Sequence, residues 1–197
     1  FKSNSFCSLF NQKKKNKLEF HLRDLNDSRS LDRFKNVNYL IHCASMTNAE
    51  KSFGKKKEMY RNNINCLKTV IKYCIKNKIK LIHLSSTSVY GKQTDLVDET
   101  CEKKYLKPQS PYAKIKLIEE QMLKKEKNLQ YVTFRFGTIS GISQGIRFHT
   151  AVNKFCLNAA INEDITVYKT ALNQYRPYLS VKDAFKTFKF CIEKNFF

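Results

Sequence analysis

Tyr112 and Lys116 are the residue pair in this chain whose types and spacing are best suited to acid–base chemistry. Positions i and i+4 lie on the same face of a helix, so in a helix the two side chains would be neighbours. An ammonium held beside a phenol stabilises the phenolate and lowers a tyrosine pKa that is ordinarily about 10. Such a tyrosine can accept and return a proton near neutral pH. The pair therefore predicts a general acid–base site if this segment is helical.

The spacing of this pair is not specific by itself. The chain has 10 Tyr and 30 Lys, and a second pair with the same spacing occurs at Tyr178 and Lys182. The second pair is predicted at a strand, where four residues span about 13 Å, so only the first pair can bring its two groups together. The first pair also has a suitable setting, because SSTSVYG at 85–91 places hydroxyls after a predicted strand and Pro111 suits the first turn of a helix.

The elements that must position these residues are predicted from the spacing of apolar positions. Short apolar runs predict strands at 17–22, 37–43, 79–84, 131–136 and 165–168, and a spacing of three and four predicts helices at 57–77, 111–127 and 148–160. Strands that alternate with helices of this length imply right-handed crossovers and a parallel sheet. Ligands of such sheets bind beyond the carboxyl ends of the strands, and small or hydroxyl residues follow three of the predicted strands.

With these motifs in place, the chain resembles the extended short-chain dehydrogenase/reductases, and among them the NAD-dependent nucleotide-sugar epimerase/dehydratase family. Seven blocks carry the resemblance in the family's order: LRDLND at 22–27, VNYLIHCAS at 37–45, NNINCLKTVIKYC at 62–74, LIHLSSTSVYG at 81–91, PYAKIK at 111–116, FRFGTISG at 134–141 and QYRPYLSVKDA at 174–184. The resemblance implies an α/β fold, with a Rossmann-like doubly wound parallel sheet and a small, partial C-terminal substrate-binding region. It implies an NAD(P)-binding domain at residues 1–141 and part of a substrate-binding region at residues 142–197.

The resemblance also implies a role for each matching residue. Tyr112 would be the acid/base, Ser86 would hydrogen-bond the reacting hydroxyl, and Lys116 would hold the nicotinamide ribose and lower the pKa of Tyr112. NAD is the expected cofactor, with NADP as the alternative, and the expected cofactor-binding residues are Asp24, Leu25, Cys43, Ala44, Ser45, Asn63, Ser85, Tyr112, Lys116 and Gly137. The expected substrate-binding residues are Ser86, Thr87, Thr138, Arg147 and Arg176. The fork of an arginine such as Arg176 suits the diphosphate of a nucleotide-sugar.

Some of these residues have simpler interpretations. Asp24 follows a predicted strand, where an aspartate often only caps a helix or stabilises a turn. Asn63 competes with its neighbour Asn62 for the same assignment. Ser86 could satisfy backbone groups at the end of a strand without touching a ligand.

The chain departs from the family's pattern in four places. The positions of its five glycines exclude the family's GxxGxxG loop, which binds pyrophosphate at a helix N-terminus. The sequence is therefore expected to lack the family's first strand and this loop. The C-terminal substrate-binding region is expected to be incomplete as well. Thr87 and Ser88 stand where the sugar 4,6-dehydratases have Asp and Glu for water elimination, which disfavours dehydratase chemistry. Pro177 follows Arg176 where many members have Asp, so the resemblance does not fix the sugar.

Composition excludes several other classes of protein. The net charge is +20, but the 30 Lys and 7 Arg are spread along the chain, which disfavours specific nucleic-acid binding. The seven cysteines contain no CxxC pair, so no disulfide framework or metal site is expected. His42 and His83 lie in predicted strands and are interpreted as core or strand-end residues. Unpaired cysteines within apolar segments indicate a reducing, cytoplasmic setting. No apolar run approaches the roughly 20 residues that cross a bilayer, so no membrane partner is expected.

The preferred interpretation is a nucleotide-sugar enzyme that works like a 4-epimerase, through a transient 4-keto intermediate. One alternative is a reductase or dehydrogenase of a related hydroxyl or keto substrate, which would produce or consume NAD(P)H in net terms. The other is an inactive or RNA-associated member of the fold, which would bind RNA in a salt-sensitive way and would not bind NAD. The resemblance also implies a homodimer, with the helices that begin near Lys57 and Pro111 as the candidates for its interface.

Overall fold

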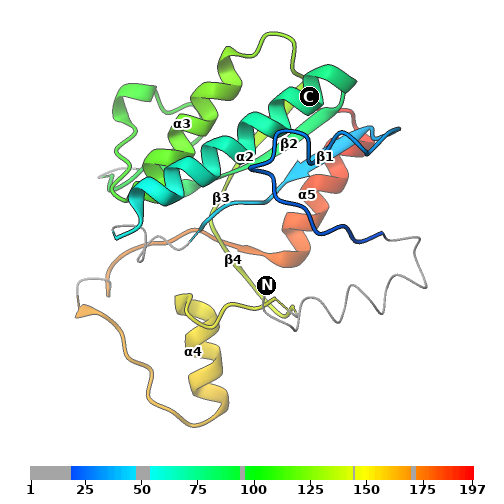
Figure 1. Ribbon diagram of the computed structural model, residues 1–197. Helices are drawn as coiled ribbons and strands as arrows, with labels where there is room; N and C mark the ends of the chain where they lie inside the picture. The colour runs from blue at the N-terminus through cyan, green and yellow to red at the C-terminus, as the bar shows by residue number, and fades with distance from the viewer. Residues whose placement is uncertain (1–18, 48–53, 94–95, 144, 170–171) are drawn as a thin grey trace. The chain divides into compact units, whose positions relative to one another are not determined.

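The structure is a computed structural model that describes residues 19–47, 54–93, 96–143, 145–169 and 172–197 (Figure 1). Its contacts divide the chain into two compact units. One unit, which we call the sheet unit, consists of Arg23–Phe136 and Phe188–Phe197. The other, which we call the small unit, consists of Phe1–Leu22 and Gly137–Thr187.

The sheet unit contains a three-stranded sheet in the order β1-β2-β3, and both pairs of strands are parallel. Its strands are β1 (Tyr39–His42), β2 (Lys80–Ser86) and β3 (Tyr131–Phe136). Parallel neighbours require a long crossover. α2 (Lys56–Asn77) provides the crossover from β1 to β2, and α3 (Pro111–Lys125) provides the crossover from β2 to β3. The α/β fold with a parallel sheet that the sequence predicts is confirmed.

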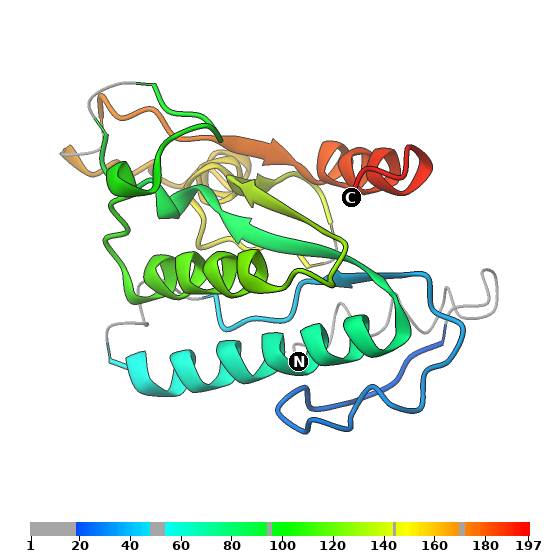
Figure 2. The same cartoon turned by 90° about the horizontal axis from the view of Figure 1, so that it is seen from above.

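The two helices α2 and α3 lie side by side on the same face of the sheet (Figures 1 and 2). α2 packs against β1 and α3 packs against β2. The largest core cluster combines the buried face of α2 with residues of β2 and the end of α3: Leu67, Val70, Ile71, Tyr73, Cys74, Ile79, Leu81, Leu123 and Leu129. The apolar spacing of three and four along α2 is what directs its core residues to one face.

Side chains of β2 and β3 alternate between the two faces of the sheet, as in any strand. His83 on β2 and Arg135 on β3 point toward α3 and hydrogen-bond to its glutamates. Phe134 and Phe136 point to the opposite face, where their rings lie 6.3 and 5.7 Å from the ring of Phe188, measured between centroids. The face of β3 that carries Arg135 is therefore directed to α3, the helix that contains Tyr112 and Lys116.

The first turn of α3 is fixed by its cap. Ser110 precedes the helix with extended backbone, and its Oγ accepts the backbone N–H of Ala113 at 3.1 Å. Pro111 occupies the first helical position, where the missing N–H costs nothing. A capping serine typically stabilises a helix by about 1 kcal/mol. Because the helix begins at a defined residue, the direction of Tyr112 in its first turn is defined as well.

The small unit contains a two-stranded parallel sheet and two helical segments. Its strands are β4 (Thr138–Ser140) and β5 (Tyr178–Ser180). α4 (Ala151–Ala160) lies between them in sequence. α5 (Val181–Glu193) follows β5, and its residues up to Thr187 belong to the small unit while the rest belong to the sheet unit. Gly137 permits a close approach before β4, because a Cβ at this position would lie 2.5 Å from the carbonyl oxygen of Pro177.

Two of the predicted strands are wrong. Of the strand expected at 17–22, residues 17 and 18 lie outside the described residues and residues 19–22 form no strand. Residues 165–168 form no strand either. A strand requires a partner, and neither segment pairs with another strand in the described part of the chain; Leu22 and Tyr168 are correspondingly 67% and 79% exposed. The strand β4 and the helix α5 were not predicted from the periodicity.

Within the described residues, no helix is both long enough and apolar enough to cross a membrane.

Candidate active site

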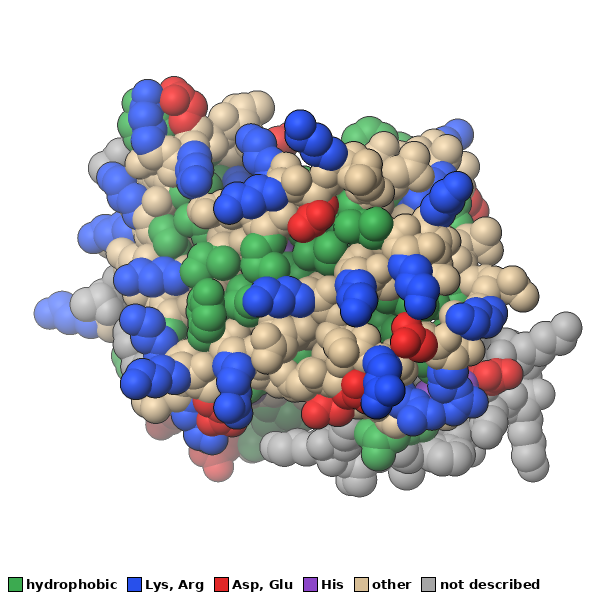
Figure 3. Space-filling model, turned by 45° about the horizontal axis from the view of Figure 1, so that its top comes forward, with side chains coloured by type: hydrophobic (Ala, Val, Ile, Leu, Met, Phe, Trp, Pro, Cys, Tyr) green, Lys and Arg blue, Asp and Glu red, His purple; other side chains and the backbone are tan. Residues whose placement is uncertain are grey.

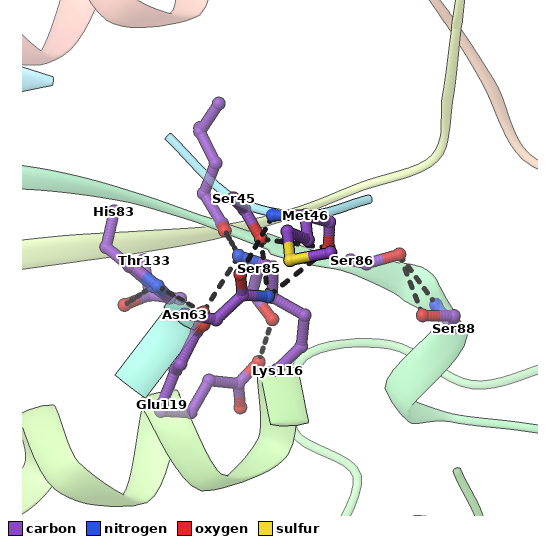
Figure 4. Close-up of polar contacts among 12 residues, drawn as sticks. Ser45, Met46, Asn63, His83, Ser85, Ser86, Ser88, Lys116, Glu119 and Thr133 are labelled. Carbon is purple, nitrogen blue, oxygen red and sulfur yellow. Dashed lines mark hydrogen bonds and ion pairs between the residues drawn. The ribbon is translucent and has the colours of Figure 1, made fainter. Parts of the chain in front are cut away.

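The turn after β1 is held by one buried asparagine from α2. Asn63 is only 1% exposed, and its Oδ1 accepts the backbone N–H of Met46 at 2.8 Å. Its Nδ2 donates to Ser45 Oγ at 2.9 Å and to the carbonyl oxygen of Met46 at 3.2 Å (Figure 4). The amide of Asn63 therefore uses its hydrogen bonds on this turn. These bonds fix the position of Ser45 in the turn.

Asp24 belongs to a second set of hydrogen bonds that is connected to this turn. The backbone N–H and the side-chain Nδ2 of Asn26 both donate to Asp24 Oδ1 at 2.9 Å, and these bonds hold the pKa of the exposed Asp24 carboxyl below its ordinary value. Asn26 Nδ2 also donates to Asn62 Oδ1 at 3.0 Å, and Asn62 Nδ2 donates to Asn63 Oδ1 at 3.2 Å. The two neighbouring asparagines thus have different partners: Asn63 holds the turn after β1, and Asn62 anchors the segment of Asp24.

Ser86 lies where β2 passes into a short 3-10 helix, η1 (Thr87–Val89). Its Oγ accepts the backbone N–H of Ser88 at 3.2 Å and the hydroxyl of Ser88 at 2.9 Å (Figure 4). A serine hydroxyl has two acceptor lone pairs and one proton. With Ser88 bound to the lone pairs, the proton of Ser86 remains to be donated to another group.

Tyr112 and Lys116 lie close together in α3. Lys116 Nζ is 5.9 Å from the centre of the Tyr112 ring. The ring is half-buried and packs against a small cluster of Met59, Ile64 and Ile115. Lys116 is 4% exposed, and its Nζ donates to the carbonyl oxygen of Leu84 on β2 at 2.9 Å. The helix packs against both β2 and η1, the elements that carry Ser86. The cation is thus held at a defined place beside a partly desolvated phenol.

A buried carboxylate also binds this ammonium. Glu119 is 1% exposed, and its Oε2 is 2.8 Å from Lys116 Nζ and 3.1 Å from Nε2 of the fully buried His83 (Figure 4). Burial acts to raise the pKa of Glu119, but the hydrogen bonds and charges of His83 and Lys116 outweigh it and hold the pKa below its ordinary value. Burial lowers the pKa of His83, and it lowers that of the adjacent His42 to about 4. Near neutral pH, Glu119 is therefore ionised and both histidines are neutral.

Glu120, the next residue of α3, makes a separate ion pair with Arg135. The guanidinium donates from Nε to Glu120 Oε1 at 3.0 Å and from NH2 to Oε2 at 2.7 Å, a bidentate arrangement. Ser85 Oγ donates to the same Oε1 at 2.5 Å, and the guanidinium carbon lies 4.9 Å from the centre of the Tyr90 ring. The hydrogen bond to Glu120 raises the pKa of Arg135. This pair ties α3 to the carboxyl ends of β2 and β3.

The other predicted site residues divide between the two units. In the sheet unit, Leu25 and Thr87 are half-buried, while Cys43 and Ala44 are exposed after β1. The remaining predicted residues belong to the small unit: Gly137, Thr138, Arg147 and Arg176. Arg147 and Arg176 are exposed, and Arg176 NH2 donates to Gln174 Oε1 at 2.5 Å. The ligand roles of all these residues stay predictions.

Sequence reasoning missed the carboxylates and their partners. Glu119 and Glu120 follow Lys116 by three and four residues, so helical spacing alone places both on its side of α3. That signal was available. His83 and Arg135 could not be paired with them from sequence, because the contacts depend on the packing of β2 and β3 under the helix. Among the described residues, no group of three or more His, Cys, Asp or Glu could hold a metal ion.

The parallel sheet and the placement of Tyr112 and Lys116 on one helix agree with the fold and the motif that the sequence resemblance implies. The sequence pattern of the NAD dependent epimerase/dehydratase family matches residues 3–196, and the chain belongs to this family. The family predicted from the sequence motifs is confirmed. NAD, the cofactor predicted from the same motifs, is the one that the family's description states.

Solved structures with the same fold include sugar-nucleotide enzymes. The UDP-glucuronic acid 4-epimerase from Bacillus cereus, in complex with UDP-glucuronic acid and NAD, is 22% identical with a TM-score of 0.81 over 96% of this chain and 60% of that chain. The dTDP-glucose 4,6-dehydratase from Streptomyces venezuelae is 19% identical with a TM-score of 0.80 over 95% of this chain and 58% of that chain. The UDP-N-acetylglucosamine 4-epimerase from Methanobrevibacter ruminantium M1 is 27% identical with a TM-score of 0.70 over 83% and 54%. The chain spans less than two thirds of the length of each.

Residues of the sheet unit fit the two nucleoside ends of NAD, the nicotinamide riboside and the adenosine. Lys116 Nζ binds two acceptors of the described residues and has three N–H groups, so one N–H remains for a ribose hydroxyl. Both bonds from Asn26 reach Asp24 Oδ1, which leaves the exposed Oδ2 to accept from an adenine amino group. The described residues contain no glycine-rich loop for the diphosphate between these ends.

Proposed function

We propose that this chain carries the catalytic residues of an NAD-dependent enzyme that acts on a nucleotide-sugar as a 4-epimerase. The observation that carries the proposal is the buried ammonium of Lys116, 5.9 Å from the ring of Tyr112, on a helix packed against the turn of Ser86. Membership of the NAD dependent epimerase/dehydratase family supports NAD as the cofactor. The 4-epimerases among the similar structures support a nucleotide-sugar as the substrate.

Tyr112 is the residue that moves the proton. As a phenolate, it takes the proton from a substrate hydroxyl, and the positive charge of Lys116 stabilises that phenolate. NAD, when bound, would supply reversible hydride transfer at the same carbon. Tyr112 then gives its proton back to the substrate oxygen. The C–H and O–H bonds that break in the first half are re-formed in the second, so the net reaction is an inversion at one carbon.

Ser86 is the residue that orients the substrate oxygen. Because Ser86 Oγ accepts two hydrogen bonds from Ser88, its own proton is directed to an external acceptor. A donated hydrogen bond steadies the oxygen while Tyr112 removes its proton, and it is preorganised before the substrate arrives. Lys116 has a second task, since its remaining N–H is suited to hold the nicotinamide ribose.

The choice of an epimerase over a dehydratase rests on the residues after Ser86. Water elimination needs an acid and a base beyond Tyr112, and the corresponding positions hold Thr87 and Ser88. η1 contains no carboxylate, and the hydroxyl of Ser88 is already bound to Ser86. These two side chains support a reaction in which only one proton and one hydride move.

The test is the interconversion of C4 epimers by the full chain supplied with NAD. A set of UDP- and dTDP-linked sugars is incubated with the protein, and the products are identified by proton NMR. We expect an equilibrium mixture of C4 epimers with no net change at the nicotinamide absorption band. Net formation or consumption of NAD(P)H would instead establish a dehydrogenase or reductase, and loss of water would establish a dehydratase; either result overturns the epimerase proposal.

The variant Tyr112→Phe tests the assigned acid/base. It removes only the phenol oxygen, so we expect NAD binding to persist while turnover falls by about a thousandfold. Tyr105→Phe is the matched control, because Tyr105 is 50% exposed in the 3-10 helix η2 (Lys103–Tyr105), and its turnover should equal that of the wild type. Full activity of Tyr112→Phe would contradict the assignment.

A further inference from the structure

The buried carboxylate of Glu119 is a feature that the proposed reaction does not use. It lies three residues beyond Lys116 in α3, and its Oε2 receives two hydrogen bonds, one from Lys116 Nζ at 2.8 Å and one from His83 Nε2 at 3.1 Å. A buried ion pair of this kind is often no more stable than apolar residues of the same volume. Stability alone is therefore a weak reason for its presence, and its position beside the ammonium suggests a different one.

We propose that Glu119 is a positioning residue that fixes the Lys116 ammonium beside Tyr112 and offsets part of its charge. The proposal deepens the proposed function and rests on it for the role of Tyr112. It concerns a contact within the chain itself, so that part of it can be tested without cofactor or substrate.

The first argument is the geometry of the ammonium. Lys116 has a long, flexible side chain, and an ammonium without partners would sample many positions. Two acceptors from different elements restrict it: the carbonyl oxygen of Leu84 on β2 and the carboxylate of Glu119 on α3. Two fixed bonds define the direction of the third N–H. That third N–H is the one suited to the ribose.

The second argument is the anchoring of Glu119 itself. A neutral histidine has one N–H and one bare nitrogen, and an ionised carboxylate can only accept, so His83 Nε2 must be the donor to Glu119. His83 Nδ1 is then the acceptor that lies 3.5 Å from Thr133 Oγ1. Side chains from β3, β2 and α3 thus form one chain that ends at Lys116. The Oε2 atom that accepts from the ammonium also accepts from His83, so the carboxylate cannot follow the ammonium freely.

The third argument is charge. Glu119 is ionised and His83 is neutral near pH 7, so the pair of Lys116 and Glu119 carries no net charge. The phenol of Tyr112 then experiences a weaker positive potential than a lone ammonium would give. The other titratable side chains that act on this group come from β1, α2, α3 and the residue after β1: His42, Cys66, Glu120 and Cys43. None of these is hydrogen-bonded to Lys116 Nζ in the described structure. Glu119 is therefore the side chain that offsets the positive charge of Lys116.

The direct test is the NMR signal of the Lys116 ammonium in the full chain, without ligands. Buried, hydrogen-bonded lysine ammonium groups exchange their protons slowly and give proton–nitrogen cross-peaks, and the Lys116 peak is the one absent from Lys116→Met. In Glu119→Gln we expect the exchange rate of this peak to rise by about tenfold or more, since a charge-assisted bond is lost. The control Glu58→Gln removes an exposed carboxylate that pairs with Lys55, and it should leave the Lys116 peak unchanged.

A second variant covers the case in which Glu119→Gln does not fold. Glu119→Asp keeps the carboxylate charge but shortens the side chain by one methylene. It should therefore also raise the exchange rate of the Lys116 ammonium protons. An exchange rate that equals the wild-type rate in whichever variants fold, with only the melting temperature lowered, would show that Glu119 is merely structural and would overturn the proposal.

The pH profile of turnover tests the charge effect in the NAD-loaded enzyme. Removing the negative charge in Glu119→Gln favours the phenolate of Tyr112, so the acidic limb of the profile should move to lower pH, whereas a loss of packing alone would not move it. An unmoved limb in an active variant would contradict the offset of charge. If no protein, including the wild type, shows turnover while the Lys116 peak responds as expected, the proposed function fails and the positioning role of Glu119 stands.

Discussion

Neighbouring hydroxyls at the carboxyl end of β2 differ in what their hydrogen bonds leave available. Ser85 donates its proton to Glu120, so it can offer a ligand only a lone pair. Ser86 accepts from Ser88 at both lone pairs, so it can offer only its proton. The geometry therefore suits Ser86 to the proposed role of donor to a substrate oxygen, and it makes Ser85 part of the connection between β2 and α3.

Ser88→Ala tests whether Ser88 orients Ser86. The substitution removes the hydroxyl that donates to Ser86 Oγ at 2.9 Å but keeps the backbone bond at 3.2 Å. One neutral hydrogen bond contributes about 1 kcal/mol, which corresponds to a roughly fivefold loss of kcat. The affinity for NAD should not change, because Ser88 serves only the substrate side. Steady-state kinetics and isothermal titration calorimetry measure the two quantities.

Thr100→Ala provides the control for this variant. Thr100 also bonds through its hydroxyl to a residue two positions away, Asp98, but it lies in an exposed loop. Its removal should leave both kcat and NAD affinity at wild-type values. A kcat of Ser88→Ala that equals that of Thr100→Ala would show that the backbone bond alone suffices to orient Ser86.

At the level of residues, the sequence predicts local pairs and misses distant ones. The proximity of Tyr112 and Lys116 follows from helical spacing, and so does the side of α3 on which Glu119 lies. The bond between Glu119 and His83 joins residues 36 positions apart and depends on the register of β2 beneath α3. Likewise, only the structure separates the roles of the adjacent Asn62 and Asn63.

At the level of elements, the connection from β2 to α3 depends on the conformation of Gly91. Its φ is +68°, and its backbone pairs with that of Lys107, so that the two ends of the long loop meet. A Cβ at Gly91 would lie 1.8 Å from the carbonyl oxygen of Lys107. The loop can therefore close in this way only because residue 91 has no side chain.

Gly91→Ala should consequently destabilise the protein by about 2 kcal/mol or more, because it adds both backbone strain and a collision. The free energy of unfolding from urea titration measures the effect. Gly54→Ala is a matched control, since a Cβ at Gly54 would meet nothing within 4 Å, and it should change the stability by less than about 0.5 kcal/mol. Equal stabilities of the two variants would show that the loop closes without this glycine.

Periodicity predicted the helices and the buried strands of the sheet unit because each buries one continuous apolar surface. α2, β2 and β3 agree with their predicted ranges to within two residues. The segment at 165–168 has the apolar composition of a strand, but no strand of the described residues pairs with it. Composition alone cannot show whether a segment has such a partner. The three-residue strand β4 is too short to have a period, so its existence follows only from its pairing with β5.

At the level of the whole molecule, the net charge of +20 is not concentrated at one place on the face shown in Figure 3. Lysine and arginine side chains are scattered there among acidic, apolar and uncharged groups. A surface that follows a nucleic-acid backbone would gather its cations in a continuous patch. On this face, the arrangement supports the interpretation of the lysines as solvated charges. At the candidate site, the paired cations are Lys116, with Glu119, and Arg135, with Glu120.

The buried histidines give the whole protein a specific dependence of stability on pH. Burial and the neighbouring His83 lower the pKa of His42 from 6.5 to about 4. Between these two values the unfolded chain binds a proton that the folded protein does not bind, so the free energy of unfolding falls as the pH falls. The slope from His42 reaches about 1.4 kcal/mol per pH unit, and the full loss is roughly 3 kcal/mol. His83, whose pKa burial also lowers, adds to the slope in the same direction.

Urea unfolding between pH 7 and pH 5 measures this slope in a range above the titration of the carboxylates, including Glu119, whose pKa is lowered. His42→Phe keeps a ring against His83, whose centroid is 6.0 Å away, and removes the titrating group. We expect it to flatten the dependence by the His42 contribution. His149→Phe, at an exposed position, should keep the wild-type slope. A His42→Phe protein that loses stability toward pH 5 as steeply as the wild type would show that His42 takes up its proton in the folded state, which contradicts its burial as a neutral ring.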